Sequence, residues 1–252
     1  SIRLWEKIGA EGRGSFYDSV GALRDVGQNH LLQMLALVTM ERPENFRAHA
    51  IRTQRAEILK TVVVPLRRDI VRASFRAQYA GYREIAGVQS DSHTETYFKI
   101  RAELSHLRWR GVPIIMEAGK RLGAQEKEIE MLFKHPLPCF CPPGAGAHYQ
   151  NRVVFSLEPD EKITIHFWSK KPGFVTEMEE RTFEFLLRDA RGKTQYVEEY
   201  QKLLLDCIAG DQTLFVSTEE IRSMWRFTDP IVRAWKDGAV PLTEYAPDTN
   251  AW

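Results

Sequence analysis

The chain has 252 residues, of which 43% are apolar and 11% aromatic, enough for one large globular domain spanning residues 1–252. Its 35 Lys and Arg nearly cancel its 34 Asp and Glu, so the net charge of +1 predicts no nucleic-acid partner and no anionic membrane partner. The three cysteines are too few for a disulfide framework, and no apolar run reaches the ~20 residues of a membrane span, so we expect a reduced, cytoplasmic protein.

The amino-terminal half is predicted to be mainly helical after a short strand. Residues 1–7 alternate like a strand and lack both an initiator Met and a signal peptide, so we expect the chain to be part of a longer protein. A helix is predicted over 18–40, with Asp18 or Ser19 as N-cap, and its last turns are apolar enough to be buried on most sides. Two further helices are predicted over residues 43–60 and 66–79.

The pattern changes at Thr94 to apolar and polar residues in alternation, which indicates strands. Six are predicted: residues 98–104, 113–116, 128–133, 152–157, 162–168 and 182–187. Helices follow over 195–209 and 218–235, the second opened by the capping box at 217–220 and broken near Pro230. Helices, strands and helices in this order predict an α+β fold with a large, mainly antiparallel sheet backed by helices.

Residues 24–30 place polar groups directly before an apolar run in the first helix. Asp25 and His30 need hydrogen-bond partners if they are buried there. Spacing alone favours a core histidine for His30, because it lies one turn from Val26 and one from Met34.

The same segment, Arg24-Asp25-Val26-Gly27-Gln28-Asn29-His30-Leu31-Leu32-Gln33-Met34-Leu35, resembles the signature of the glucose-6-phosphate dehydrogenase family. Other motifs agree in the family's order over nearly the whole chain: residues 11–14, 17–18, 78–79, 94–97, 108–113, 119–122, 170–173, 204–206 and 225–226. The resemblance is to the carboxyl-terminal, substrate-binding and dimerisation domain. The amino-terminal Rossmann domain, which makes most of the contacts with NADP in the family, is absent from this chain.

The resemblance implies oxidation of glucose 6-phosphate to 6-phosphogluconolactone with NADP, the first step of the pentose phosphate pathway. His30 matches the catalytic base, Glu6 and Asp25 match carboxylates that bind sugar hydroxyls, and Lys120 matches a lysine that binds the sugar or its phosphate. Without the resemblance these three charges would be ordinary surface or turn residues. The family also implies a homodimer through the sheet, and the isolated chain should be inactive.

Two departures from the family qualify this interpretation. A second basic residue is expected five positions after Lys120, but Gln125 stands there, with Lys127 as a substitute, and Glu158 replaces a usual substrate-binding Gln. Animal members hold a structural NADP with basic residues at positions that here are Glu117, Glu126, Glu130 and Ser156. Acidic side chains repel phosphates, so we predict no structural NADP site.

Three alternatives remain open from the sequence. The loop containing His135, Cys139, Cys141 and His148 offers four zinc ligands, but their spacing is not that of a usual zinc site, and we predict no metal. The chain could be a stand-alone binding or dimerisation module without catalysis. It could also belong to a paralogue that acts on another phosphorylated aldose, given Gln125 and Glu158.

Overall fold

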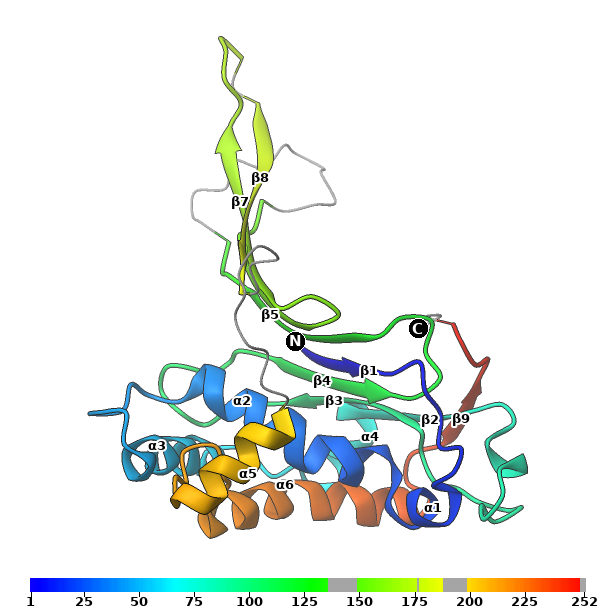
Figure 1. The fold of residues 1–252 in the computed structure, drawn as a ribbon. Helices are drawn as coiled ribbons and strands as arrows, with labels where there is room; N and C mark the ends of the chain where they lie inside the picture. Colours follow the sequence, from blue (N-terminus) through cyan, green and yellow to red (C-terminus); the bar gives the residue numbers. More distant parts are fainter. Residues whose placement is uncertain (136–148, 176, 188–198, 250–252) are drawn as a thin grey trace. The chain divides into compact units, whose positions relative to one another are not determined.

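A computed structural model of the chain describes residues 1–135, 149–175, 177–187 and 199–249 (Figure 1). It divides into two compact units, one made of Ser1 and Glu126–Lys193 and the other of Ile2–Gln125 and Thr194–Trp252. In the described ranges, no helix is both long and apolar enough to cross a membrane. A single domain over residues 1–252 stays a prediction.

The first unit is an antiparallel sheet with the strand order β5-β6-β7-β8. The strands are β5 (Glu126–Leu132), β6 (Arg152–Glu158), β7 (Lys162–Lys170) and β8 (Met178–Leu186). The last pair is the longest, running from Lys162 opposite Leu186 to Lys170 opposite Met178. The four strands predicted from alternation between residues 128 and 187 are therefore confirmed.

The second unit contains five strands in the order β1-β4-β3-β2-β9. They are β1 (Ile2–Trp5), β4 (Ile114–Gly119), β3 (Tyr97–Ala102), β2 (Ser74–Tyr79) and β9 (Leu242–Tyr245). The pairs β1–β4 and β2–β9 are parallel, whereas β2–β3 and β3–β4 are antiparallel. The predicted strands at the start of the chain and around residues 98–104 and 113–116 are confirmed.

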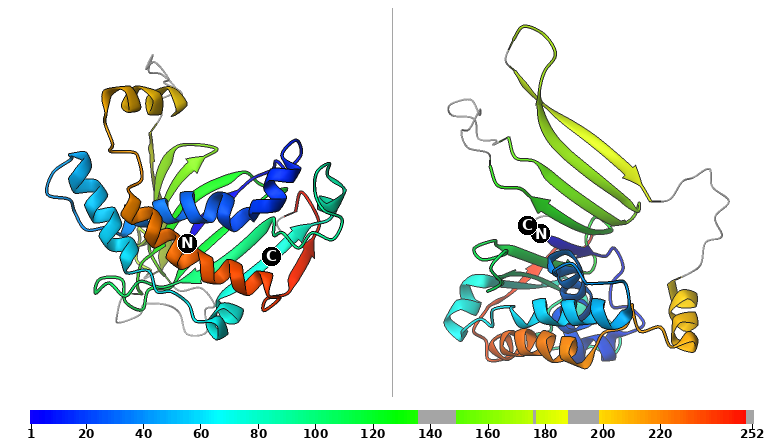
Figure 2. Two further views of the ribbon diagram at one scale, coloured as in Figure 1. Left: turned by 90° about the horizontal axis from the view of Figure 1, so that it is seen from below. Right: turned by 90° about the vertical axis from the view of Figure 1, so that its left-hand side faces the viewer.

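Helices cover one face of the second unit's strands (Figures 1 and 2). The helices of this unit are α1 (Gly14–Ala22), the π-helix η1 (Leu23–Leu31), α2 (Leu32–Thr39), α3 (Ala48–Lys60), α4 (Arg67–Ala73), the 3₁₀-helix η2 (Tyr82–Glu84), α5 (Glu199–Ala209) and α6 (Thr218–Lys236). Helix α6 packs on η1, α3 and α4, and η1 packs on β4. The predicted α+β fold, a mainly antiparallel sheet backed by helices, is confirmed.

The predicted helix over 18–40 is wrong in its start and its continuity. Helix α1 begins at Gly14 without a side-chain cap, and the chain kinks at Gly21, where φ is 76°. The prediction that its last turns are buried on most sides is confirmed, because Leu32, Leu35, Ala36 and Thr39 of α2 are buried and Leu37, at 51%, is the one exposed residue of this helix.

Three other helix predictions need correction. The helix predicted over 43–60 begins only at Ala48, and the one predicted over 66–79 ends at Ala73, because Ser74–Tyr79 pairs with β3 on one side and β9 on the other. Helix α6 continues through Pro230, since packing of its buried face outweighs the lost hydrogen bond. The capping box at Ser217 and Glu220 is confirmed.

Candidate functional site

Glu6 and Lys120 meet at the carboxyl ends of two neighbouring parallel strands of the second unit. Glu6 follows β1 and Lys120 follows β4, and Trp5 stands opposite Gly119. The Glu6 N–H donates to the Gly119 carbonyl at 2.9 Å, which extends this register by one residue. Lys120 Nζ then donates to Glu6 Oε2 at 2.8 Å. The structure therefore brings these two predicted substrate-binding residues into direct contact.

Lys120 is held in place by more than this ion pair. It is only 5% exposed, and its Nζ lies 5.3 Å from the centroid of the Tyr17 ring. The Tyr245 hydroxyl donates to the Lys120 carbonyl at 2.5 Å, which fixes the backbone from the carboxyl-terminal strand β9. A lysine with partners on several sides is a pre-positioned cation rather than a mobile surface charge.

The π-helix η1 carries the other two predicted site residues. It starts just after Gly21, which has a positive φ. At this point Glu95 accepts hydrogen bonds from two backbone N–H groups that have no partner within the helix. Ala22 N–H donates to the Glu95 carbonyl and Leu23 N–H to Glu95 Oε1, both at 3.0 Å. At Gly27 an added Cβ would lie 2.7 Å from Phe98 Cζ, so glycine is required for η1 to approach β3 so closely.

Asp25 and His30 lie five residues apart on η1. Hydrogen bonds in a π-helix link residues five apart, so Asp25 and His30 are separated by one hydrogen-bonded turn. Asp25 has a side chain 15% exposed, with Oδ1 at 3.7 Å from Arg13 Nη2. His30 is exposed, so the core histidine favoured by spacing alone is wrong. Among the described contacts, none joins His30 to Glu6, Asp25 or Lys120.

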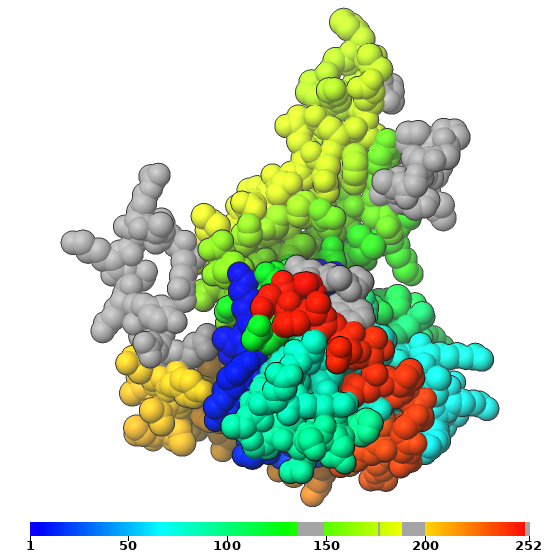
Figure 3. All heavy atoms as spheres, turned by 90° about the vertical axis from the view of Figure 1, so that its right-hand side faces the viewer, coloured from blue at the N-terminus to red at the C-terminus, as the bar shows by residue number. Residues whose placement is uncertain are grey.

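An open hollow of about 520 Å³ borders Lys120. It is lined by Lys7, Ile8, Gly9, Glu11, Arg13, Lys120, Arg121 and Asp248. Figure 3 shows the segments that form it, the amino-terminal one in blue and the carboxyl-terminal one in red, on one face of the second unit. Arg121 joins them, since its Nη2 lies 2.8 Å from Asp248 Oδ2 and its Nη1 3.3 Å from Glu11 Oε1. Lys120 differs from Arg121 in the hollow, because its partners are the half-buried Glu6 carboxylate and the Tyr17 ring.

Burial raises the pKa of two side chains near this site, Tyr17 and Glu95. Burial raises the pKa of Tyr17 well above its ordinary value, and the nearby Glu95 and Asp25 carboxylates raise it further. Burial also raises the pKa of Glu95, while the hydrogen bond from Leu23 N–H acts in the opposite direction. Tyr17 therefore remains a neutral phenol at physiological pH.

The positions that depart from the family are engaged in contacts inside the fold. Within the first unit, Lys127 pairs with Glu158, so the substitute cation already has a carboxylate partner. In the second unit, Glu117 is 5% exposed and accepts hydrogen bonds from Tyr97 Oη at 2.6 Å and Trp5 Nε1 at 3.1 Å. Glu126 and Glu130 lie on β5 and Ser156 on β6. The absence of a structural NADP site stays a prediction.

The loop considered for zinc can be followed only in part. His135 is described, whereas Cys139, Cys141 and His148 lie outside the described residues. Within the described ranges, no group of three or more His, Cys, Asp or Glu side chains is placed to hold a metal.

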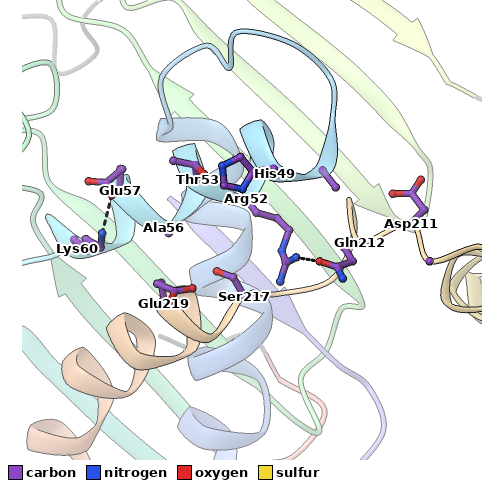
Figure 4. A pocket seen from close by; sticks show the side chains of 12 residues that line it. His49, Arg52, Thr53, Ala56, Glu57, Lys60, Asp211, Gln212, Ser217 and Glu219 are labelled. Atoms are coloured by element: carbon purple, nitrogen blue, oxygen red, sulfur yellow. Dashed lines mark hydrogen bonds and ion pairs between the residues drawn. The ribbon is translucent and has the colours of Figure 1, made fainter.

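A second hollow of about 580 Å³ lies between α3 and the segment from Gly210 to Glu219 (Figure 4). Its cations and carboxylates are intermixed: Lys60 pairs with Glu57 at 2.6 Å, and Arg52 bonds to Gln212. It contains none of the predicted site residues. Nothing in it selects a ligand of one charge.

Sequence reasoning missed three residues that shape the site: Tyr17, Glu95 and Tyr245. Tyr17 and Glu95 fall within the family motifs at 17–18 and 94–97, so the motif match was the available signal. Tyr245 lies on a strand that was not predicted, and only the tertiary contact with Lys120 reveals it.

Comparison with known proteins gives one consistent result. The family model described as "Glucose-6-phosphate dehydrogenase, C-terminal domain" matches residues 1–251. The chain is 38% identical over 238 residues to glucose-6-phosphate 1-dehydrogenase of Aggregatibacter actinomycetemcomitans, covering 90% of this chain and 47% of the relative. It is 38% identical over 232 residues to glucose-6-phosphate 1-dehydrogenase 1 of Mycobacterium tuberculosis, covering 92% and 48%.

Two solved structures are similar over almost the whole chain. One is glucose-6-phosphate 1-dehydrogenase from Mycobacterium avium, with a TM-score of 0.83, 32% identity and coverage of 98% of this chain and 50% of that one. The other is described as glucose-6-phosphate dehydrogenase in complex with its substrate glucose-6-phosphate, with a TM-score of 0.86, 29% identity and coverage of 98% and 51%. The chain thus spans about half the length of the relatives it matches.

Proposed function

Because the chain belongs to the glucose-6-phosphate dehydrogenase C-terminal domain family, we propose that it is the substrate-binding half of an NADP-dependent glucose-6-phosphate dehydrogenase. The reaction is oxidation of C1 of glucose 6-phosphate to the 6-phosphogluconolactone, the first step of the pentose phosphate pathway. One observation carries the proposal: the lysine matched to substrate binding is buried, paired with Glu6 and adjacent to an open hollow.

Each of the four residues has a role that fits its position. Lys120 donates hydrogen bonds to the phosphate or to a sugar oxygen, and Glu6 and Asp25 accept hydrogen bonds from sugar hydroxyls. His30 is exposed on η1 and takes the proton of the C1 hydroxyl, for which a neutral imidazole is suited. NADP supplies the acceptor for the C1 hydride and is bound mainly outside this chain, so the chain alone is expected to be inactive.

The first unit supports the proposal of a homodimer. Its sheet exposes several large apolar side chains on β7 and β8: Ile165 at 38%, Phe167 at 38%, Phe183 at 58% and Phe185 at 54%. An exposed apolar patch of this kind is typical of a protein interface. We propose that a second copy of the chain covers it, and that the protein works in the cytoplasm, in line with its few cysteines.

Binding of glucose 6-phosphate to the chain tests the proposed function. Isothermal titration calorimetry should detect binding by the unmodified chain, and Lys120→Met should weaken it by roughly 10- to 100-fold, because a charge-assisted hydrogen bond contributes about 1.5–3 kcal/mol. His30→Asn is the matched control and should bind with nearly unchanged affinity, since the base acts on C1. Absence of binding by the unmodified chain would contradict the proposal.

A paralogue acting on another phosphorylated aldose is the second candidate. This candidate is favoured by the ion pair between Lys127 and Glu158. Lys127 is the cation expected to replace the basic residue that is missing at Gln125, and its charge is already paired. Titrating the same chain with several aldose phosphates distinguishes the two, because the preferred ligand binds most tightly. A dimerisation module would bind none of them selectively, whereas a sugar-phosphate-binding module without catalysis would bind them and yield no activity in the full-length protein.

A further inference from the structure

We propose that Tyr17 is a positioning residue, which holds the ammonium group of Lys120 in the orientation that receives an anionic sugar phosphate. The inference rests on the proposed function, since it assigns a role to the substrate-binding Lys120. It concerns a residue that does not itself touch the substrate. Tyr17 acts through the lysine.

The geometry of the pair carries the first step. Tyr17 comes from α1 and Lys120 from the turn after β4, and Lys120 Nζ lies 5.3 Å from the centroid of the Tyr17 ring. An ammonium group within about 6 Å of an aromatic face is attracted by the negative charge of that face. The attraction is stronger where water is excluded, and here the Lys120 side chain is only 6% exposed.

A second partner is needed because the lysine stem is flexible. Lysine has several rotatable bonds, and one ion pair with Glu6 leaves the ammonium free to rotate about it. Contact with the Tyr17 ring at the same time restricts that motion. The ammonium has three N–H donors, and with one directed to Glu6 the others remain for an anion that enters the hollow beside it.

Tyr17 is itself rigidly placed. It is 1% exposed and packs edge-to-face on Tyr82, with ring centroids 6.1 Å apart. Tyr82 packs on Tyr79 at 5.5 Å, and Tyr79 on Tyr245 at 6.1 Å. The Tyr245 hydroxyl donates to the Lys120 carbonyl, so this row of rings contacts the same lysine at its ammonium and at its backbone.

The ring of Tyr17, rather than its hydroxyl, must supply the effect. The hydroxyl oxygen is buried and has no hydrogen-bond partner among the described residues. Such a group costs stability and cannot orient a neighbour. Phenylalanine keeps the aromatic face, so Tyr17→Phe should preserve the affinity for glucose 6-phosphate, whereas Tyr17→Leu should not.

Calorimetric titration of the chain with glucose 6-phosphate tests the inference. We expect Tyr17→Leu to weaken binding about 3- to 30-fold and Tyr17→Phe to change it by less than about 2-fold. Phe227→Leu is the control for general loosening, because Phe227 is a buried aromatic residue on α6, 2% exposed, that is not part of this row of rings. Its affinity should stay within about 2-fold of the unmodified chain.

A double-mutant cycle identifies the route of the effect. If Tyr17 acts through Lys120, adding Tyr17→Leu to Lys120→Met should cause no further loss of affinity. An equal loss in both backgrounds would overturn the inference, as would unchanged affinity in Tyr17→Leu or an equal loss in Phe227→Leu. Absence of binding by the unmodified chain would instead overturn the proposed function and this inference together.

A spectroscopic measurement covers the case in which Tyr17→Leu does not fold. In the unmodified chain and in Tyr17→Phe, the ring face should shift the NMR signals of the Lys120 ε-methylene protons upfield, and Lys120→Met assigns those signals by their loss. Ordinary lysine shifts in both folded proteins would show that the ammonium does not lie over the ring. That result would overturn the inference without requiring the leucine variant.

Discussion

Glu95 shows how one buried carboxylate supports the segment that carries the site. It is 8% exposed and accepts the Leu23 N–H at the start of η1. Burial raises its pKa above the ordinary value, so the folded state binds this proton more tightly than the unfolded state does. Its contribution to the free energy of unfolding is therefore greatest below the ordinary carboxyl pKa, and it is lost as the pH rises through the raised pKa.

Glu95→Gln should remove this pH dependence while keeping an oxygen acceptor for Leu23. Relative to the unmodified chain, the variant should gain stability as the pH rises from about 4 to 7, because only the carboxylate ionises. Urea unfolding at several pH values measures the difference, and other titrating groups cancel in the comparison. Parallel stability curves for the two proteins would contradict the argument.

For single residues, the match to family motifs located more of the candidate site residues than helical spacing did. It selected Glu6 and Lys120, which the structure places 2.8 Å apart, although no spacing rule joins residues 114 positions apart. Spacing alone placed His30 in the core because it assumed an α-helix, whereas the chain forms a π-helix there and exposes the imidazole. The roles of His30, Glu6, Asp25 and Lys120 stay predictions.

The backbone kink at Gly21, between α1 and η1, sets the direction of η1, the helix that carries Asp25 and His30. Gly21 combines a φ of 76° with a ψ of 164°, a region accessible almost only to glycine. An added Cβ would also lie 2.5 Å from Glu95 Oε1, the oxygen that caps η1. The conformation and the close approach thus both require glycine.

Gly21→Ala should therefore destabilise the chain by about 3 kcal/mol or more, from backbone strain and the displaced cap together. Gly81→Ala is the matched control, because φ is 86° there but an added Cβ meets nothing within 4 Å. It should cost only about 1–2 kcal/mol. Urea unfolding of both variants measures the contrast, and equal losses would show that neither the backbone conformation of Gly21 nor the contact with Glu95 adds to the cost.

Among the elements, periodicity predicted those that depend on local pattern and failed where distant pairing decides. The alternating strands β3 and β5–β8 were found this way. The segment Ser74–Tyr79 was predicted as helix, but hydrogen bonds to β3 and β9 make it a strand. The strand β9 has only four residues, and its partner lies more than 160 positions away, so no local signal could reveal it.

For the molecule as a whole, the apolar face on β7 and β8 predicts its oligomeric state. Phe183→Lys places a charge in that face and should convert a dimer into a monomer, because a buried unpaired charge opposes association. Folding should be little affected, since Phe183 is 58% exposed in the single chain. Sedimentation equilibrium at several protein concentrations measures the mass.

Leu107→Lys is the control for this prediction. Leu107 is 84% exposed but belongs to the second unit, so its substitution should leave a dimer intact. A monomeric unmodified chain, or a Phe183→Lys variant that remains dimeric, would contradict assembly through this face. Composition and alternation predicted the α+β fold, but the division into two units is visible only in the tertiary contacts.

The π-helix gives the segment Leu23–Leu31 one residue more per hydrogen-bonded turn than an α-helix has. Deleting one residue between Asp25 and His30 would allow ordinary α-helical hydrogen bonds and leave these two residues four apart, a spacing that places side chains on one face of an α-helix. The loss of one residue there should therefore convert this part of η1 to an α-helix without separating Asp25 from His30 around the helix axis.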